Sequence, residues 1–511
     1  MESTTIDKKF MKNKGFIPYY VFVCILMTLV SCSKHPALPE VYNNSNQLPT
    51  IYPDYTDVTI PSNIAPMNFM AENAEACIAQ FSWGNHSQTF GNANKVQIPL
   101  KEWQEIMEET KGESIQITVY TQQNKEWTRH KPFHIHVAQE EVDPYISYRV
   151  ISPSYTAYEM LSINQRHLGS FDESVVYNNM LINKGANGQC INCHSYQNYG
   201  TNNMQFHMRQ TQGGTMIVSD GVPRKVNLKT SETLSAGVYP AWHPTQKLIA
   251  YSTNKTGQSF HTKELGKVEV FDSRSDLILY DIEKNQVSTI SAEEDELEIY
   301  PWWSPDGNTL YYASAHFVYS YDIAEDAEVI NRYKDIKYNI YRRKFDTTNH
   351  TFSEPELVYD AASNGQSATL PRISPCGRFL LFSMGDDGCF HIWHPEADLY
   401  IMDLTNGEVH PLEEANSNAA ESYHSWSSNG RWILFSSRRD DSNYTRLYLS
   451  YVDEYGRARK AFAVPQEDPE YYYHYLRSYN VPEFMSEPVS ISPQEFAAAA
   501  KKEAIQALYK N

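Results

Sequence analysis

YPAWHPTQKLIAYS, residues 239–252, is the first of four segments built on one template. The others are YPWWSPDGNTLYYAS (300–314), LPRISPCGRFLLFS (370–383) and YHSWSSNGRWILFSS (423–437). Each segment has an aromatic or apolar entry, a tight polar turn, and then a run of apolar and aromatic residues. Three of the turns carry the glycine that a hairpin needs at positive φ: Asp306-Gly307, Cys376-Gly377 and Asn429-Gly430. The template therefore predicts a repeated β-hairpin.

Each hairpin is followed by a second stretch of alternating character. These stretches are DLILYDIEKNQV (276–287), NIYRRKFDTTNHTF (339–352), DLYIMDLTNGEV (398–409) and TRLYLSYVDEYG (445–456). The four templates begin 53 to 70 residues apart, and each repeat offers about four short strands, which fits the blades of a β-propeller. Because Thr215–Val218 begins a further blade, the sequence predicts a mainly β protein with a propeller of five or six blades over 204–480.

The stretch Cys190-Ile191-Asn192-Cys193-His194 has the spacing of a c-type haem attachment site. In that motif two thiols bond the porphyrin and the adjoining histidine ligates the iron. Two other interpretations stay open: the cysteines form a disulfide, or they donate two ligands to a zinc site. We expect one covalent haem c on Cys190 and Cys193, with His194 on the iron, in an attachment loop at 186–203.

The sixth ligand of such an iron has three candidates, with Met208 and His207 ranked before Met204. Methionine would raise the reduction potential relative to histidine, while an open position would permit ligand binding or peroxidase-like chemistry. Core packing of the methionines and a strand hydrogen bond of His207 are the alternatives.

The start of the chain predicts export. Lys12 and Lys14 precede an apolar run that ends at Cys32 and is too short to span a bilayer. Residues 1–31 are therefore predicted to be a lipoprotein signal peptide, with Cys32 acylated and anchored in the membrane; an uncleaved transmembrane anchor is the alternative. We expect an outer-membrane lipoprotein on the periplasmic face, with display at the cell surface as the alternative.

With the export signal and the haem motif in place, the chain resembles TolB-like propellers, which share the S-P-D-G hairpin followed by D-L-x-x-x-D. Its whole layout is similar to a family of exported proteins typical of Bacteroidetes. That closer resemblance lies in NQRHLGSFDESVVYNNMLINKGANGQCINCHSY (164–196), TRLYLSYVDEYGRARKAFAVPQEDP (445–469) and SYNVPEFM (478–485). It implies a non-catalytic interaction platform at the cell envelope, and a cytochrome-like protein in members with the haem motif. The chain departs from the hairpin pattern at Cys376 and Ser428.

Charge and cysteine usage limit the partners. The chain has 43 basic and 62 acidic residues, a net charge of −19, which argues against nucleic acid because phosphate binding needs concentrated Lys and Arg. Beyond the cysteines discussed above, and Cys24 within the signal peptide, Cys77, Cys376 and Cys389 remain. Their odd number argues against a disulfide framework.

The N-terminal part of the mature chain divides in two. Residues 32–60 are rich in Pro, Asn, Tyr and Thr without periodicity and are expected to be a tether. Residues 61–185 predict a small β-sandwich-like domain of Ig character, since Ile115, Ile117 and Val119 alternate on one strand face.

Two helices are expected. Leu100, Trp103 and Ile106 have helical spacing before Gly112. The tail, 481–511, contains an S-x-x-E capping box that begins a helix at Ser492.

Two functional classes stay open. In the first, the protein is a haem-bearing lipoprotein for electron transfer or redox sensing, and its propeller docks an envelope protein. In the second, it is a propeller scaffold that binds protein or glycan, and the C-x-x-C pair is a structural disulfide. Catalysis, by a haem peroxidase or a polysaccharide hydrolase or lyase, is less favoured because the sequence has no G-x-S-x-G or H-E-x-x-H signature. His391 and His394, which flank Trp393, are candidates for a propeller-mouth or metal site, with structural use favoured.

Overall fold

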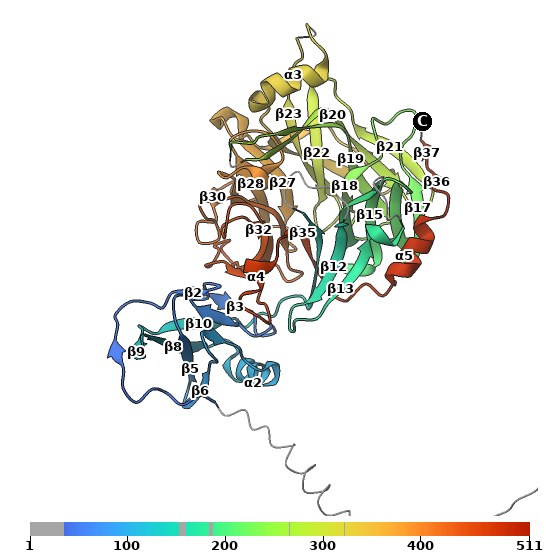
Figure 1. Cartoon of the computed structure of the whole chain (residues 1–511). Helices are drawn as coiled ribbons and strands as arrows, with labels where there is room; N and C mark the ends of the chain where they lie inside the picture. The colour runs from blue at the N-terminus through green and yellow to red at the C-terminus, as the bar shows by residue number, and fades with distance from the viewer. Residues whose placement is uncertain (1–34, 153–159, 183–187, 265, 321, 511) are drawn as a thin grey trace, which may run out of the picture.

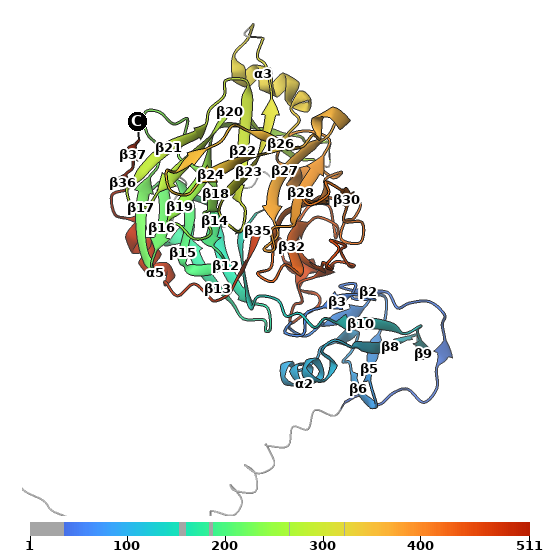
Figure 2. The same cartoon turned by 180° about the vertical axis from the view of Figure 1, so that it is seen from behind.

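The computed structural model describes residues 35–510 except 153–159, 183–187, 265 and 321. The predicted signal peptide and Cys32 lie outside the described residues. Figure 1 shows a small N-terminal domain in blue below a larger body of sheets, and Figure 2 shows the same two parts from behind. No helix in the described ranges is long and apolar enough to cross a membrane.

The N-terminal domain is β-rich, as expected, and contains one helix. A seven-stranded sheet has the order β1-β9-β8-β10-β3, with β5 paired to β8 and β6 to β5, and a three-stranded sheet has the order β2-β4-β7. The elements are β1 (Asn43–Asn44), β2 (Ile51–Tyr52), β3 (Thr59–Ile60), β4 (Phe69–Ala71), β5 (Ala76–Trp83), β6 (His86–Phe90), β7 (Lys95–Val96), α2 (Leu100–Thr110), β8 (Ser114–Gln123), β9 (Glu126–Arg129) and β10 (Phe133–Val137). The predicted amphipathic helix is α2, which buries Trp103, Ile106 and Met107.

The expected tether is wrong from residue 43 onward. Strand β1 pairs with β9 and strand β3 pairs with β10, both in parallel. Tyr55, Val58 and Ile60 are completely buried in the core of the domain. Apolar residues scattered among prolines have no helical or strand period, so their burial could not be recognised from the sequence.

The body consists of antiparallel sheets that follow one another along the chain. The sheet orders are β14-β15-β16-β17, β18-β19-β20-β21, β22-β23-β24 with β25 and β26, β27-β28-β29-β30, and β31-β32-β33-β34; a single bridge, Ser275 to Leu297, joins the second and third sheets. The first three sheets are built from β14 (Gln189–Gln197), β15 (Gly200–Gln210), β16 (Gly214–Ser219), β17 (Val222–Asn227), β18 (Val238–Trp242), β19 (Leu248–Phe260), β20 (Val268–Asp281), β21 (Gln286–Ser291), β22 (Glu296–Trp303), β23 (Thr309–His316), β24 (Asn339–Asp346), β25 (Thr351–Phe352) and β26 (Glu356–Tyr359). The last two are built from β27 (Ser367–Ile373), β28 (Phe379–Gly385), β29 (Asp398–Asp403), β30 (Val409–Pro411), β31 (Glu421–Trp426), β32 (Trp432–Ser437), β33 (Arg446–Tyr451) and β34 (Phe462–Ala463). Helix α3 (Glu325–Arg332) lies between β23 and β24.

One further sheet joins distant parts of the chain. Strands β11 (Tyr145–Ile151), β12 (Ser162–His167) and β13 (Glu173–Asn178) pair with β35 (Ser478–Met485) in the order β13-β12-β11-β35. Strands β11, β12 and β13 therefore belong to the body and not to the N-terminal domain, where the sequence placed them. The predicted attachment loop at 186–203 is wrong from residue 189 onward, where β14 and the beginning of β15 replace it.

The predicted turns and C-terminal helix are confirmed. Gly307, Gly377 and Gly430 have φ of 73°, 75° and 66°. Helix α5 (Pro493–Ala500) begins with the expected capping box of Ser492 and Glu495. It ends earlier than the sequence pattern suggested, because residues after 500 form the edge strands β36 (Ile505–Gln506) and β37 (Leu508–Tyr509), which pair with β17 and β21. The short helix α4 (Tyr471–His474) precedes β35.

Candidate functional site: an aromatic mouth above a narrow channel

One backbone irregularity recurs in six sheets of the body. In each, the register shifts at a strand residue that is not glycine but has positive φ. These residues are Cys193 (55°), Tyr239 (51°), Tyr300 (56°), Leu370 (56°), Tyr423 (48°) and Val481 (50°). Side chains other than glycine rarely adopt this conformation, which costs of order 1–3 kcal/mol. Six equivalent cases indicate an architectural bulge.

The side chains of all six bulge residues line one narrow cavity of about 40 Å³, here called the channel. The six strands that carry them, β14, β18, β22, β27, β31 and β35, therefore surround a common axis. A cavity of this size holds at most a few water molecules. The channel is filled by its own side chains.

The third residue after each bulge lines a second, wider cavity of about 540 Å³, here called the mouth. These residues are Tyr196, Trp242, Trp303, Ile373, Trp426 and Phe484. Trp302, Tyr199, Asn198 and several serine and proline residues of the hairpin turns complete the lining. Aromatic walls with few polar groups are typical of ligand sites, and pockets for drug-sized molecules have about 300–1,000 Å³. The mouth is the candidate binding site.

The second residue after the bulge supplies two charged groups: Glu483, which lines both the mouth and the channel, and Arg372, which lines the channel. Arg372 and Glu483 occupy this position in β27 and β35, and Trp302 occupies it in β22. The guanidinium of Arg372 lies 4.0 Å from the ring centre of Trp302, a cation–π contact. No ion pair engages Arg372 within the described ranges, where its Nη1 donates to the Pro371 carbonyl.

Burial sets the protonation of both groups. Burial raises the pKa of Glu483 to about 8, since neither the charge of Arg372 nor a backbone hydrogen bond from Tyr196 offsets it fully. Burial lowers the pKa of Arg372 to about 10, so the guanidinium stays charged at neutral pH. At neutral pH the channel therefore carries a cation, Arg372, and the Glu483 carboxyl that lines both cavities is mostly neutral.

Replacing Glu483 by Gln should reduce the loss of stability in alkaline solution. A glutamate whose pKa rises from 4.5 to about 8 on folding stabilises the protein fully below pH 4.5, and this stabilisation is lost as the pH rises through 8. Since one pKa unit corresponds to ~1.4 kcal/mol, the variant should gain about 1–3 kcal/mol over the wild type between about pH 5 and about pH 9 in urea unfolding. Burial also raises the pKa of Glu298 to about 8. Because Glu298 is present in both proteins, it contributes equally to the pH dependence of their free energies of unfolding. Parallel pH profiles of the two proteins would contradict the assignment.

The haem motif lies on β14 within this repeat. Cys193 is the bulge residue and faces the channel, whereas Cys190 is half-buried against a hydrophobic cluster that includes Ile191 and does not line the channel. No disulfide links the described cysteines. Burial raises the pKa of the Cys193 thiol.

His194 is buried beside Cys193, and burial lowers the pKa of its imidazole to about 3. Neither ring nitrogen has a hydrogen-bond partner in the described part of the chain, which by itself would suit a ligand. His194 is the first residue after the bulge. In four other strands this position holds a proline, and in a fifth it holds the buried His424; the prolines are Pro240, Pro301, Pro371 and Pro482. A buried histidine thus occurs at this position without any cysteine pair.

Covalent haem does not fit these residues in the folded chain. Cys190 does not line the channel that Cys193 and His194 line, and this channel of about 40 Å³ is far smaller than pockets of about 300–1,000 Å³ that enclose drug-sized ligands. The predicted sixth ligands lie on β15, the strand that pairs with β14, where His207 is opposite Asn192 and Met208 is opposite Ile191. Met204 and Met208 are buried in a hydrophobic cluster, and His207 Nδ1 lies 3.1 Å from the Thr215 hydroxyl.

Comparisons with known proteins give no family. No family model matches the chain, and no curated protein matches it either. Among solved structures, TolB from Acinetobacter baumannii is 13% identical with a TM-score of 0.41, over 76% of this chain and 85% of that chain. Prolyl oligopeptidase B from Galerina marginata, bound to a 35mer substrate, is 10% identical with a TM-score of 0.35, over 68% of this chain and 41% of that chain. An oligogalacturonate lyase in complex with manganese is 12% identical with a TM-score of 0.28, over 67% and 87%. The chain is mainly β and has TolB-like propeller proteins among its structural neighbours, but with TM-scores this low none of them bears on its function.

Proposed function

We propose that this protein is an exported binding protein with a six-bladed β-propeller that holds a saccharide in the aromatic mouth. The blade count rests on the six bulges, whose residues all line one channel. Strand β35 would close the ring by completing the sheet of β11, β12 and β13. The observation that carries the binding role is the convergence of six aromatic or apolar side chains, one from each blade, on the mouth.

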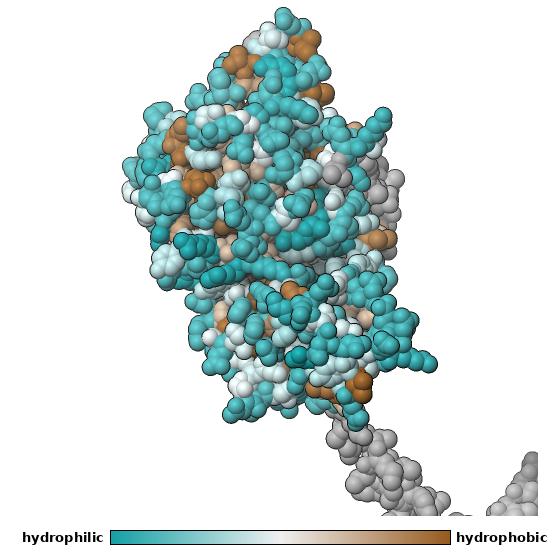
Figure 3. All heavy atoms as spheres, turned by 90° about the vertical axis from the view of Figure 1, so that its left-hand side faces the viewer, coloured by the Kyte–Doolittle hydropathy of each residue, from teal (hydrophilic) through white to brown (hydrophobic). Residues whose placement is uncertain are grey.

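A saccharide suits the mouth better than an apolar ligand. A sugar ring has an apolar C–H face that packs on aromatic rings and a rim of hydroxyl groups that needs hydrogen-bond partners. The half-buried rings of Trp302 and Tyr199 offer such faces, and Asn198, Ser304 and Ser428 offer polar groups at the rim. The surface seen in Figure 3 is mainly hydrophilic with scattered apolar side chains, so that face presents no broad apolar docking patch.

The charges favour an acidic sugar. Arg372 is a half-buried cation that lines the channel, packs on Trp302 of the mouth and has no ion-pair partner in the described ranges. A carboxylate is the ligand group that a guanidinium pairs with best. Glu483 is the one acidic residue among those that line the mouth. Because glycoside hydrolysis normally uses two carboxyl groups, binding without cleavage is the proposed role.

Binding of tetramannuronate and mannotetraose, two β-1,4-linked tetrasaccharides that differ in the oxidation of C6, tests the charge assignment. Calorimetry should give tighter binding of the uronate at neutral pH. Its affinity should fall as the pH rises through 8, because Glu483 then ionises and competes for Arg372. Glu483→Gln should keep the uronate affinity nearly constant over this range. Preference for the neutral sugar, or the same pH dependence in the variant, would contradict the proposal.

Export and anchoring belong to the proposal as well. The apolar run ending at Cys32 motivates an acylated cysteine and an outer-membrane lipoprotein. Cys32→Ala should release the protein from the membrane fraction. Retention of the variant in membranes would mean that the N-terminal segment stays as a transmembrane anchor.

A further inference from the structure

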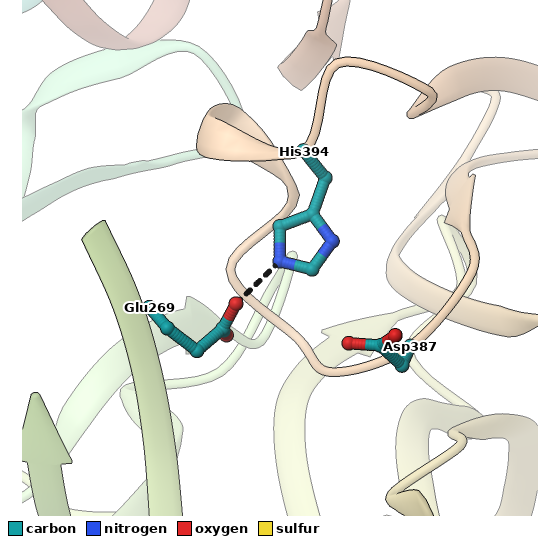
Figure 4. Close-up of side chains that lie close together, drawn as sticks. All are labelled: Glu269, Asp387 and His394. Carbon is teal, nitrogen blue, oxygen red and sulfur yellow. Dashed lines mark hydrogen bonds and ion pairs between the residues drawn. The ribbon is translucent and has the colours of Figure 1, made fainter. Parts of the chain in front are cut away.

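A second group of chemically active side chains lies outside the mouth. Glu269 on β20, and Asp387 and His394 on the segment between β28 and β29, place one potential ligand atom each within 4.8 Å of the others. Figure 4 shows the imidazole between the two carboxylates, with its Nε2 2.8 Å from Oε2 of Glu269. None of the three residues lines the mouth.

One atom of this cluster has no partner although it is buried. Glu269 is only 6% exposed, and its Oε1 makes no hydrogen bond in the described structure. Leaving a buried carboxylate oxygen unpaired costs about 1–3 kcal/mol or more. The space beside it is kept open by Gly388, since a Cβ there would lie 3.2 Å from Oε1 and 3.9 Å from Nε2 of His394.

The other ring nitrogen of His394 is already oriented. Nδ1 lies 3.1 Å from Oε1 of Glu396, a carboxylate at the protein surface. Metal-binding histidines commonly donate the second ring N–H to a carboxylate, which fixes the tautomer and directs the free nitrogen at the metal. With Glu396 in this role, Nε2 is the ligand atom, and the metal ion would replace the proton that Nε2 donates to Glu269.

Negative charge in the cluster is only partly neutralised. Glu269 and Glu396 pair with His394, and no ion pair engages Asp387 within the described residues. Lys337 donates to the backbone carbonyl of Asp386 and not to a carboxylate. A bound cation would compensate this charge and give Glu269 Oε1 a partner.

We propose that Glu269, Asp387 and His394 bind one divalent transition-metal ion of the Zn²⁺ type. One imidazole and two carboxylates match the ligands of three-residue zinc sites, in which a water molecule takes the fourth position. The half-exposed Asp387 places that open position toward solvent. Ligand movements of about 1 Å bring the present spacing to the ~2.0–2.2 Å bonds of zinc.

Metal content and affinity test the site in the full-length protein. Protein freed of metal with EDTA and then loaded with Zn²⁺ alone should retain one ion per chain after gel filtration, and its Tm should rise. Asp387→Asn should weaken Zn²⁺ binding about tenfold or more, and Glu269→Gln should do the same. Asp387→Asn is the milder change, because the carboxylate makes no hydrogen bond in the described structure and its loss should leave the fold intact.

His316→Gln is the matched control, since His316 forms an exposed pair with Glu296 at 3.0 Å and should not affect the retained ion. Two results would overturn the proposal: wild-type protein that retains no Zn²⁺, or Asp387→Asn and Glu269→Gln variants that bind it as tightly as the wild type. Loss of the fold in Glu269→Gln alone would leave Asp387→Asn as the deciding variant.

Discussion

Trp302→Ala is expected to weaken saccharide binding by about 10–100-fold. The indole is half-buried at the mouth and carries the Arg372 guanidinium on its face. Truncation removes both the stacking surface and the contact that orients the cation, and buried tryptophans at binding sites are typically worth ~2 kcal/mol or more. Calorimetry with tetramannuronate measures the change.

Trp83→Ala is the control for this prediction. Trp83 is also half-buried and donates to Glu109, but it lies on β5 of the N-terminal domain. Its replacement should leave the affinity for the sugar unchanged. An equal loss in both variants would show that general destabilisation, and not the mouth, governs binding.

Protein produced together with haem-attachment machinery is expected to carry no covalent haem. Among the described residues, a channel of about 40 Å³ lies beside Cys193 and His194, and Cys190 does not line it. Intact-mass spectrometry should give the mass of the unmodified polypeptide, and the absorption spectrum should lack a Soret band. A mass increased by one porphyrin would restore the redox interpretation.

Cys193→Val provides a structural control for the motif. Val481 occupies the equivalent bulge in β35 with φ of 50°, so valine fits the conformation that Cys193 adopts. The variant should fold and unfold with a Tm close to that of the wild type, and its sugar affinity should be unchanged. A large loss of either would indicate that the thiol has a role beyond filling the repeat position.

The hairpins of four repeats could be predicted from the sequence because they have similar residues at equivalent positions. Tyr-Pro-x-Trp and its relatives are visible at 239–242, 300–303, 370–373 and 423–426. Two further copies, Cys-His-Ser-Tyr at 193–196 and Val-Pro-Glu-Phe at 481–484, share no letter with each other and were not recognised as members. Their equivalence lies in the bulge, which is a backbone property that different residues can adopt.

Cys190, Cys193 and His194 were interpreted through the C-x-x-C-H spacing, the predicted export and the family resemblance, and the motif itself is short enough to arise inside a strand. Non-local pairing was the second obstacle. The sheet of β11, β12 and β13 is completed by β35, which begins more than 300 residues later, so the domain boundary could not be placed from local patterning.

The cluster of Glu269, Asp387 and His394 could not be recognised from the sequence either, because its residues are far apart along the chain. His394 was a candidate in the sequence, but its partner Glu269 is 125 positions away and the pair forms only when β20 reaches the segment after β28. Helix α2 and the capping box of α5 were predictable because all of their determinants lie within a few residues.

A crystal structure of the protein with tetramannuronate bound tests the central claim most directly. The predicted result is a sugar ring packed on Trp302, with a uronate carboxylate within hydrogen-bond distance of the Arg372 guanidinium. A sugar bound elsewhere on the surface with the mouth free of ligand, or no bound sugar under conditions that saturate the crystal, would contradict the account.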